Sequence, residues 1–336
     1  MQKIVKNLMV SLSIALGALT IIVLIVGPSK VIKTLKIADP KYILFTFLLW
    51  LTSVFLESLA FMIGSKFMKS RISFPQSVVL IVIGRFFNAI TPFSTGGQPA
   101  QAYVMNKKSK IDFARGIGTL VIKFLIYQMV ITIYGVVVLI FAYPIARRYI
   151  SNIASLAFIG FAINSLVMLL ILLFSLNEKF AKELLHMLIN ILAFLRIIKS
   201  PEKTREEITV KIRNFKGVLG STLKYPLQTL FMALITLGQV IAFMSMAYTI
   251  YKAFEGCGHS FMEILGIQSI LSLLVSFVPT PGASGAQEGM FFIMYKNILT
   301  SNVGGALVTW RFFSYYIHIL VGAMFLPYTK SRKETA

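Results

Sequence analysis

Six apolar runs, each long enough to cross a bilayer, occupy most of the sequence. They cover residues 8–27, 42–64, 117–142, 152–176, 226–251 and 303–327. A helix needs about 20 predominantly apolar residues to pass through the hydrocarbon core of a membrane. The sequence therefore predicts an all-α polytopic membrane protein with one spanning helix for each run.

The low charge content excludes a soluble protein. Of the 336 residues, 57% are hydrophobic and 13% are charged, whereas soluble domains contain about 25% charged residues. A soluble enzyme of this size could not cover its surface with so few charges. The high apolar content also excludes intrinsic disorder.

The chain carries a net charge of +21. Its basic residues lie mainly in loops between the apolar runs, where they set the orientation in the membrane and contact anionic headgroups. The sequence offers no polar domain that would bind nucleic acid. We therefore expect anionic phospholipids, and no nucleic acid, among the partners.

Signatures of enzymes and of metal sites are missing from the sequence. The single cysteine, Cys257, excludes an internal disulfide and a cysteine-rich metal site. The nucleotide-binding P-loop and the common zinc-protease and serine-hydrolase motifs are also missing. We assign no catalytic residue, no metal and no cofactor on this basis.

Two further apolar stretches, residues 76–106 and 263–299, are each broken near the middle. The breaks read Thr91-Pro92-Phe93-Ser94-Thr95-Gly96-Gly97 and Pro279-Thr280-Pro281-Gly282-Ala283-Ser284-Gly285. Proline and glycine stop helices, and each arm is too short to span. Irregular backbone at membrane depth is tolerated only inside protein or beside a wet cavity. Both stretches are therefore predicted to be re-entrant helical hairpins.

The two breaks match each other in sequence. Residues 91–98 align without gaps with residues 280–287, and the threonine, proline, glycine and glutamine positions coincide. Matching interrupted segments in two halves of a chain indicate a transport site between inverted repeats. The prediction is six spanning helices plus two re-entrant helical hairpins in an inverted repeat. Within a single integral membrane domain, 1–336, repeat one covers about 1–176, a connector covers 177–224 and repeat two covers about 225–336.

The distribution of lysine and arginine orients this layout. Most of them fall in loops on one side, and the positive-inside rule places that side, with both chain termini, in the cytoplasm. Lys30, Lys33, Lys36 and Lys41 follow the first run and violate the rule locally. Apolar residues at helical spacing in the connector, 177–224, predict an amphipathic helix on the cytoplasmic surface.

The breaks are candidate substrate sites. The second arm of each hairpin begins beside Gly96-Gly97 or Gly285, where free N–H groups and a positive helix end favour a phosphate-like group. Gln98 and Gln287 add donors and an acceptor. The alternative is that the glycines only permit tight packing of a turn. We favour a site because two hairpins carry the same pattern.

Charged residues within the apolar segments support this interpretation, because such residues face the protein interior or a cavity. Arg85 and Arg311 are candidates for phosphate contact, and Glu57 and Glu288 for their counter-ions or for a substrate amine. Structural ion pairs are the alternative. We predict at least one Arg–Glu pair among these four near the breaks, whereas Lys123 is expected to extend to the interface. The full set of candidate substrate-binding residues is Glu57, Arg85, Asn88, Thr91, Pro92, Gly96, Gly97, Gln98, Thr280, Pro281, Gly282, Ser284, Gly285, Gln287, Glu288 and Arg311.

Both breaks, with their flanks, also resemble a known family. Gly84-Arg85-Phe86-Phe87-Asn88-Ala89-Ile90-Thr91-Pro92 running into Gly96-Gly97-Gln98-Pro99, and residues 279–289, are similar to the flippase-like transmembrane region of bacterial lysylphosphatidylglycerol synthases. These are the multiple peptide resistance factors, and many stand-alone relatives share the region. The resemblance covers nearly the whole chain, and its most specific part is the second motif.

The resemblance implies a bacterial plasma-membrane protein that moves a lipid between leaflets. In the full-length family, a soluble C-terminal domain transfers lysine to phosphatidylglycerol, and this chain is expected to lack that domain. The substrate would be a phospholipid, an aminoacylated phospholipid or a polyprenyl-phosphate carrier. A phosphatidylglycerol lysyltransferase and a small-solute or ion transporter stay open as alternatives. A separate lipid-modifying synthase as partner, and a homo-oligomer, are also left open.

Overall fold

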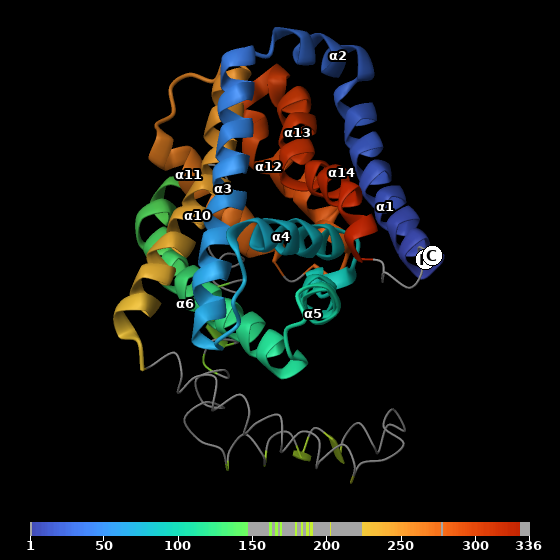
Figure 1. The fold of residues 1–336 in the computed structure, drawn as a ribbon. Helices are drawn as coiled ribbons and strands as arrows, with labels where there is room; N and C mark the ends of the chain where they lie inside the picture. The colour runs from blue at the N-terminus through green and yellow to red at the C-terminus, as the bar shows by residue number, and fades with distance from the viewer. Residues whose placement is uncertain are drawn as a thin grey trace.

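The computed structural model describes residues 2–146, 224–276 and 278–329, with single positions between 161 and 202. All regular elements in these ranges are helical (Figure 1). The predicted span at 152–176 and the predicted surface connector at 177–224 lie almost wholly outside the described residues.

Three long helices can each cross a membrane by length and apolar character. They are α3 (Pro40–Phe67), α6 (Phe113–Ala146) and α10 (Pro226–Ala253). A fourth span results if α1 (Gln2–Val26) and α2 (Pro28–Ile37), which are bent by 95° against each other, count as one. Of the five predicted spans that lie in the described ranges, three thus form single helices long and apolar enough to cross, and the first does so only together with α2.

The bend between α1 and α2 explains the lysines that violate the charge rule. Gly27 has a φ of 98° and Pro28 begins α2, so the chain turns sharply at a residue that tolerates this conformation. Val31 and Thr34 are buried in α2, whereas Lys30, Lys33 and Lys36 are exposed. The helix is therefore amphipathic, which suits a position at the membrane interface.

The last apolar run is one helix with an irregular turn in it. The sequence predicts a single span over 303–327. In the structure, α13 (Val303–Arg311), the π-helical turn η4 (Phe312–Tyr316) and α14 (Ile317–Met324) follow each other without a gap. A π-turn of this kind is rare and often lies at a functional position.

Both predicted breaks are present, and each separates two short helices. The first pair is α4 (Phe74–Ala89) and α5 (Gly97–Lys108), with the 3-10 turn η1 (Pro92–Ser94) between them. The second is α11 (Phe261–Val275) and α12 (Ala286–Leu299), with the 3-10 turn η2 (Pro281–Ala283). The helix–break–helix prediction is therefore confirmed at both places.

The two breaks begin with the same backbone conformation but differ at the equivalent glycines, where φ is -79° at Gly96 and 91° at Gly285. In each, a proline is followed by two residues in the left-handed region: φ is 53° at Phe93 and at Ser94, and 58° at Gly282 and 50° at Ala283. These residues are equivalent in the sequence alignment of the breaks. Both first arms also begin with a capping box, which Ser73 forms for α4 and Ser260 for α11.

Helices at equivalent positions of the two halves lie antiparallel. Both α3 and α10 have 28 residues and begin with proline, and they run side by side in opposite directions (Figure 1). The amide of Asp39 donates to the carbonyl of Ala253 over 2.9 Å at one end. At the other end, the rings of Phe67 and Tyr225 are 6.1 Å apart.

In each half, one helix packs on the broken helix pair of the other half. Helix α6 of the first half packs on α11 of the second, and α14 packs on α4 of the first. The turns η1 and η2 contact each other. The two breaks, far apart in sequence, therefore lie next to each other in the fold.

Candidate functional site

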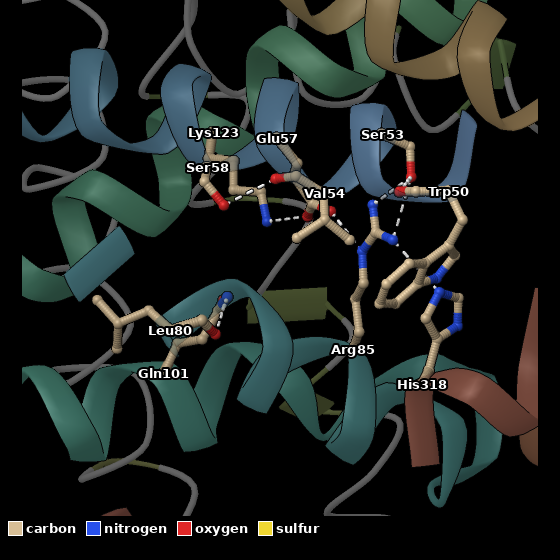
Figure 2. A network of polar contacts seen from close by, with 10 residues as sticks. All are labelled: Trp50, Ser53, Val54, Glu57, Ser58, Leu80, Arg85, Gln101, Lys123 and His318. Atoms are coloured by element: carbon tan, nitrogen blue, oxygen red, sulfur yellow. Dashed lines mark hydrogen bonds and ion pairs between the residues drawn. The ribbon is translucent and has the colours of Figure 1, made fainter. Parts of the chain in front are cut away.

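A first charge cluster joins α3, α4 and α6. Glu57 Oε2 accepts a hydrogen bond from Arg85 Nε over 2.7 Å, and Glu57 Oε1 accepts one from Lys123 Nζ over 2.6 Å. Figure 2 shows both cations on the same carboxylate. We call Glu57, Arg85 and Lys123 the first charge cluster.

The guanidinium of Arg85 has two further neighbours. Its two terminal nitrogens each lie 3.2 Å from Ser53 Oγ, and Nη1 is 3.2 Å from His318 Nε2. The His318 ring lies against Trp50, with 6.1 Å between the ring centroids (Figure 2). Side chains from α3, α4 and α14 are thus held together around one arginine.

The structure corrects the interpretation of Lys123. Its position near one end of an apolar run suggested a side chain that extends to the interface. It points instead to Glu57, and 22% of the side chain is exposed. The carboxylate on the neighbouring helix α3 is close enough to attract the ammonium group inward, which a single apolar run cannot reveal.

A second charge cluster, Arg311 and Glu288, lies behind η2. The two side chains are 1% and 0% exposed, and Arg311 Nε is 2.6 Å from Glu288 Oε1. The terminal nitrogens of Arg311 donate to Gln287 Oε1 over 2.9 Å and to Ser284 Oγ over 3.0 Å, with Gly282 O at 3.5 Å. The predicted Arg–Glu pairing near the breaks is confirmed twice, once in each cluster.

Two cavities with polar walls, of about 410 and 530 Å³, lie beside the first break. Residues of α3, α4, α6 and α10, of the turn η1 and of the end of α11 line both of them, namely Glu57, Arg85, Asn88, Phe93, Ser94, Tyr127, Gln239 and Ser276. The smaller cavity also reaches the second break and Arg311. The larger one reaches Lys123 and Gln98.

About half of the predicted site residues line these cavities. Those that do are Glu57, Arg85, Asn88, Gln98, Thr280, Gly282, Gln287 and Arg311. Those that do not are Thr91, Pro92, Gly96, Gly97, Pro281, Ser284, Gly285 and Glu288. Sequence reasoning missed Ser53, Tyr127, Gln239 and Ser276 and gave His318 no role. The signal that could have found them is a polar side chain within an apolar segment.

At the first break, the amides of both glycines are already occupied. Gly96 N donates to Thr91 Oγ1 over 2.9 Å, and Gly97 N donates to Asn88 Oδ1 over 2.8 Å. A Cβ atom on Gly96 would lie 2.6 Å from Thr91 Cγ2 and 2.9 Å from Phe87 O. The expectation that these amides are free for a phosphate is wrong, and tight packing of a turn explains both glycines.

The second break differs in the space around its glycine. Gly285 N donates to Glu288 Oε2 over 2.7 Å, so this amide is also occupied. Gly285 has a φ of 91°, is exposed, and has no atom within 4 Å of a Cβ position. At Gly285 the positive φ favours glycine, and the space beside its Cα atom is open.

An apolar groove adjoins the larger polar cavity. It has a volume of about 420 Å³ and lies between α5 and α6. Gln98 and Leu120 line both the groove and the cavity. Exposed Tyr103, Phe113 and Ile117 form much of its wall. A molecule with a polar end and an apolar end would match this arrangement.

Comparison with known proteins places the chain in a family. A family model for the lysylphosphatidylglycerol synthase transmembrane region matches residues 8–322. The chain belongs to this family. The match includes both breaks and both charge clusters, so the family resemblance seen in the sequence is confirmed.

Curated relatives of this family member are UPF0104 membrane proteins of archaea. The protein of Methanothermobacter thermautotrophicus is 24% identical over 327 residues, which cover 94% of this chain and 93% of the relative. The protein of Archaeoglobus fulgidus is 27% identical over 304 residues, which cover 88% of this chain and 89% of the relative. The protein of Pyrococcus horikoshii is 23% identical over 336 residues, which cover 96% of this chain and 97% of the relative. Like them, this family member is an integral multi-pass membrane protein.

These relatives do not bear out the bacterial origin that the resemblance implied, which stays a prediction. Among the residues that the structure describes, His, Cys, Asp and Glu side chains form no group of three that could bind a metal ion.

Proposed function

We propose that the protein moves a phospholipid, or an aminoacylated phospholipid, between the two leaflets of the membrane. The headgroup would occupy the two cavities beside the first break, the smaller of which also reaches the second, while the acyl chains stay in apolar surroundings. The observation that carries this proposal is the junction of the polar cavity with the apolar groove between α5 and α6. A carrier of a fully hydrophilic solute has no need of such a groove.

The symmetry of the two halves supports a transport mechanism. The breaks begin with the same turn, the equivalent helices α3 and α10 are antiparallel, and in each half a helix that follows the broken pair packs on the broken pair of the other half. These are the features of an inverted repeat with its substrate site at the interface of the repeats. We propose that the two broken pairs are re-entrant hairpins and that movement of one half against the other exposes the cavity to each leaflet in turn.

Within this site we assign headgroup contact to the predicted residues that line the cavities. They are Glu57, Arg85, Asn88, Gln98, Thr280, Gly282 and Gln287. Residues of the breaks that do not line the cavities, such as Thr91 and Ser284, would instead maintain the shape of the turns through their hydrogen bonds.

We place the protein in the plasma membrane with both termini in the cytoplasm. The basic residues Lys66, Lys69 and Arg71 follow α3, at the end of the helix pair where α10 begins. The positive-inside rule makes this side cytoplasmic. A separate enzyme that modifies the carried lipid is a partner to test.

The test is lipid movement in vesicles. Purified protein is reconstituted with a fluorescent phosphatidylglycerol, and an impermeant reductant destroys the fluorescence of the outer leaflet. We expect active vesicles to lose signal beyond the outer-leaflet fraction that protein-free vesicles lose. Vesicles that take up soluble ions or solutes without moving lipid would favour the transporter alternative.

A matched pair of variants tests the role of the groove. Ile117→Trp adds bulk inside the groove, whereas Ile140→Trp makes the same change on an exposed position of the same helix. We expect only Ile117→Trp to slow lipid movement.

Formation of lysylphosphatidylglycerol from phosphatidylglycerol and lysyl-tRNA by the purified protein would instead support the transferase alternative.

A further inference from the structure

The first charge cluster has one more positive than negative charge. Glu57 is the single carboxylate between Arg85 and Lys123. Among the described residues that line the two cavities, it is also the only acidic one. The remaining cation of the cavity wall, Arg311, is neutralised by Glu288 behind it. The side chains of the cavity wall therefore carry an unbalanced positive charge.

The first cluster also has donors left for a ligand. An ammonium group has three N–H donors, and Glu57 is the one hydrogen-bond partner of Lys123 among the described residues. Lys123 lines the larger cavity, and 22% of its side chain is exposed. Arg85 lines both cavities, and whereas its Nη1 contacts both Ser53 and His318, its Nη2 contacts only the Ser53 hydroxyl among the described residues.

The second cluster has no such capacity. All three nitrogens of the Arg311 guanidinium contact protein oxygens, on Glu288, Gln287 and Ser284. Both charged side chains are almost completely buried. This cluster therefore determines the shape of the second break, and the two arginines have different roles although both lie beside a break.

We propose that one anionic group of the phosphate class binds in the cavity between Arg85 and Lys123. Glu57 orients both cations while the cavity is empty and competes with the incoming anion for them. This inference rests on the proposed function and deepens it, since it gives the headgroup a net negative charge at this position. A group with a negative charge balances the cluster, and a low-dielectric site favours that balance strongly.

The reverse arrangement, with a substrate amine on Glu57, fits the geometry less well. The carboxylate would have to release two cations that it contacts at 2.6 and 2.7 Å. The amine would also add a third positive charge to the cluster. Like charges at such distances repel strongly away from water.

Binding measurements in detergent separate these possibilities without any transport step. The full chain is titrated with dioctanoyl phosphatidylglycerol, with uncharged dioctanoylglycerol, and with inorganic phosphate. We compare Lys123→Gln and Glu57→Gln with Lys66→Gln, which removes the same charge from an exposed position.

The expected signs are opposite for the two cluster variants. Lys123→Gln should weaken binding of the anionic lipid about tenfold, the usual effect of losing one charge-assisted hydrogen bond. Glu57→Gln should strengthen it, because the competing carboxylate is gone. Lys66→Gln should leave it unchanged, and dioctanoylglycerol should respond to none of the changes. Inorganic phosphate that competes with the lipid would identify the phosphate alone as the recognised group, whereas no competition would identify the lipid headgroup.

Weaker anion binding by Glu57→Gln together with unchanged binding by Lys123→Gln would overturn the proposal. If Glu57→Gln does not yield folded protein, the test rests on two variants of Lys123. Lys123→Gln should bind the anionic lipid more weakly, whereas the charge-preserving Lys123→Arg should bind it nearly as well as the parent protein. If the protein shows the expected binding pattern but moves no lipid, the anion site stands and the proposed function is refuted. If it moves lipid but lacks this binding pattern, the proposed function stands and the anion site is refuted.

Discussion

The hydroxyl oxygens of Thr46 and Thr249 lie 2.8 Å apart and connect α3 to α10 near the beginning of one helix and the end of the other. Thr46 is completely buried. Because the two helices are antiparallel, the segments after α3 and before α10 lie at one end of the pair. The segments before α3 and after α10, including Cys257, lie at the other.

The native cysteine therefore reports the orientation directly. Cys257 is exposed and is the only cysteine in the chain, and we place its end of α10 outside the cell. An impermeant maleimide should label it in intact cells. In a Cys257→Ser background, a cysteine at Lys66 should react only after the membrane is permeabilised. The reverse pattern would invert the topology.

Loss of Glu288 should cost far more stability than loss of an exposed carboxylate. Glu288→Gln leaves the buried guanidinium of Arg311 without its counter-charge, and breaking a buried pair in this way costs about 3–5 kcal/mol. Thermal unfolding in detergent would measure the effect, with Glu255→Gln, on an exposed residue, as the control. Equal unfolding temperatures for the two variants would show that the second cluster is not needed for the fold.

The two glycines that sequence reasoning treated alike should now behave differently. Gly96→Leu should abolish accumulation, because even a Cβ atom there meets Thr91 and the backbone of Phe87. Gly285→Leu enters open space and should cost about 1–3 kcal/mol of backbone strain, because φ is 91° there. Membrane abundance measured by quantitative immunoblotting distinguishes them. Equal abundance would mean that the first break can rearrange.

Asn88 combines a structural contact with a place in the cavity wall. Asn88→Ala removes the acceptor for Gly97 N and should cost about 1–3 kcal/mol, as for other buried amides left unpaired. Asn88→Asp keeps an acceptor there but adds a negative charge beside Arg85. We expect it to retain stability and to weaken binding of dioctanoyl phosphatidylglycerol. Tighter binding would contradict an anion site.

The breaks and the charge pairing could be predicted because their causes are local or general. Proline and glycine interrupt helices wherever they lie, and a buried arginine needs a carboxylate whatever the fold. The partner of each arginine could not be predicted, since Glu57 and Glu288 were equally available in sequence terms. The helix packing decides that Arg85 contacts the first and Arg311 the second.

The errors arose where a side chain of the protein itself fills a position assigned to a ligand. Thr91 and Asn88 accept the hydrogen bonds of the Gly96 and Gly97 amides, which looked free because the turn geometry was unknown. Lys123 was placed at the interface because its distance from α3 could not be read from one apolar run. Both errors arose because the sequence pattern does not show which side chains lie close together in space.

The π-turn at Phe312–Tyr316 determines which way the end of the last helix faces. In a regular α-helix, Arg311 and His318 would lie on nearly the same face, because two turns take about 7 residues. A π-turn contains one more residue per turn, so everything after it is rotated by about 100°. Arg311 can therefore point to the second break while His318 points to Arg85 beside the first. Removing a single residue from this turn would restore a regular helix and turn His318 away from Arg85. One additional residue in the turn therefore allows a single helix to contact the polar groups of both halves of the protein.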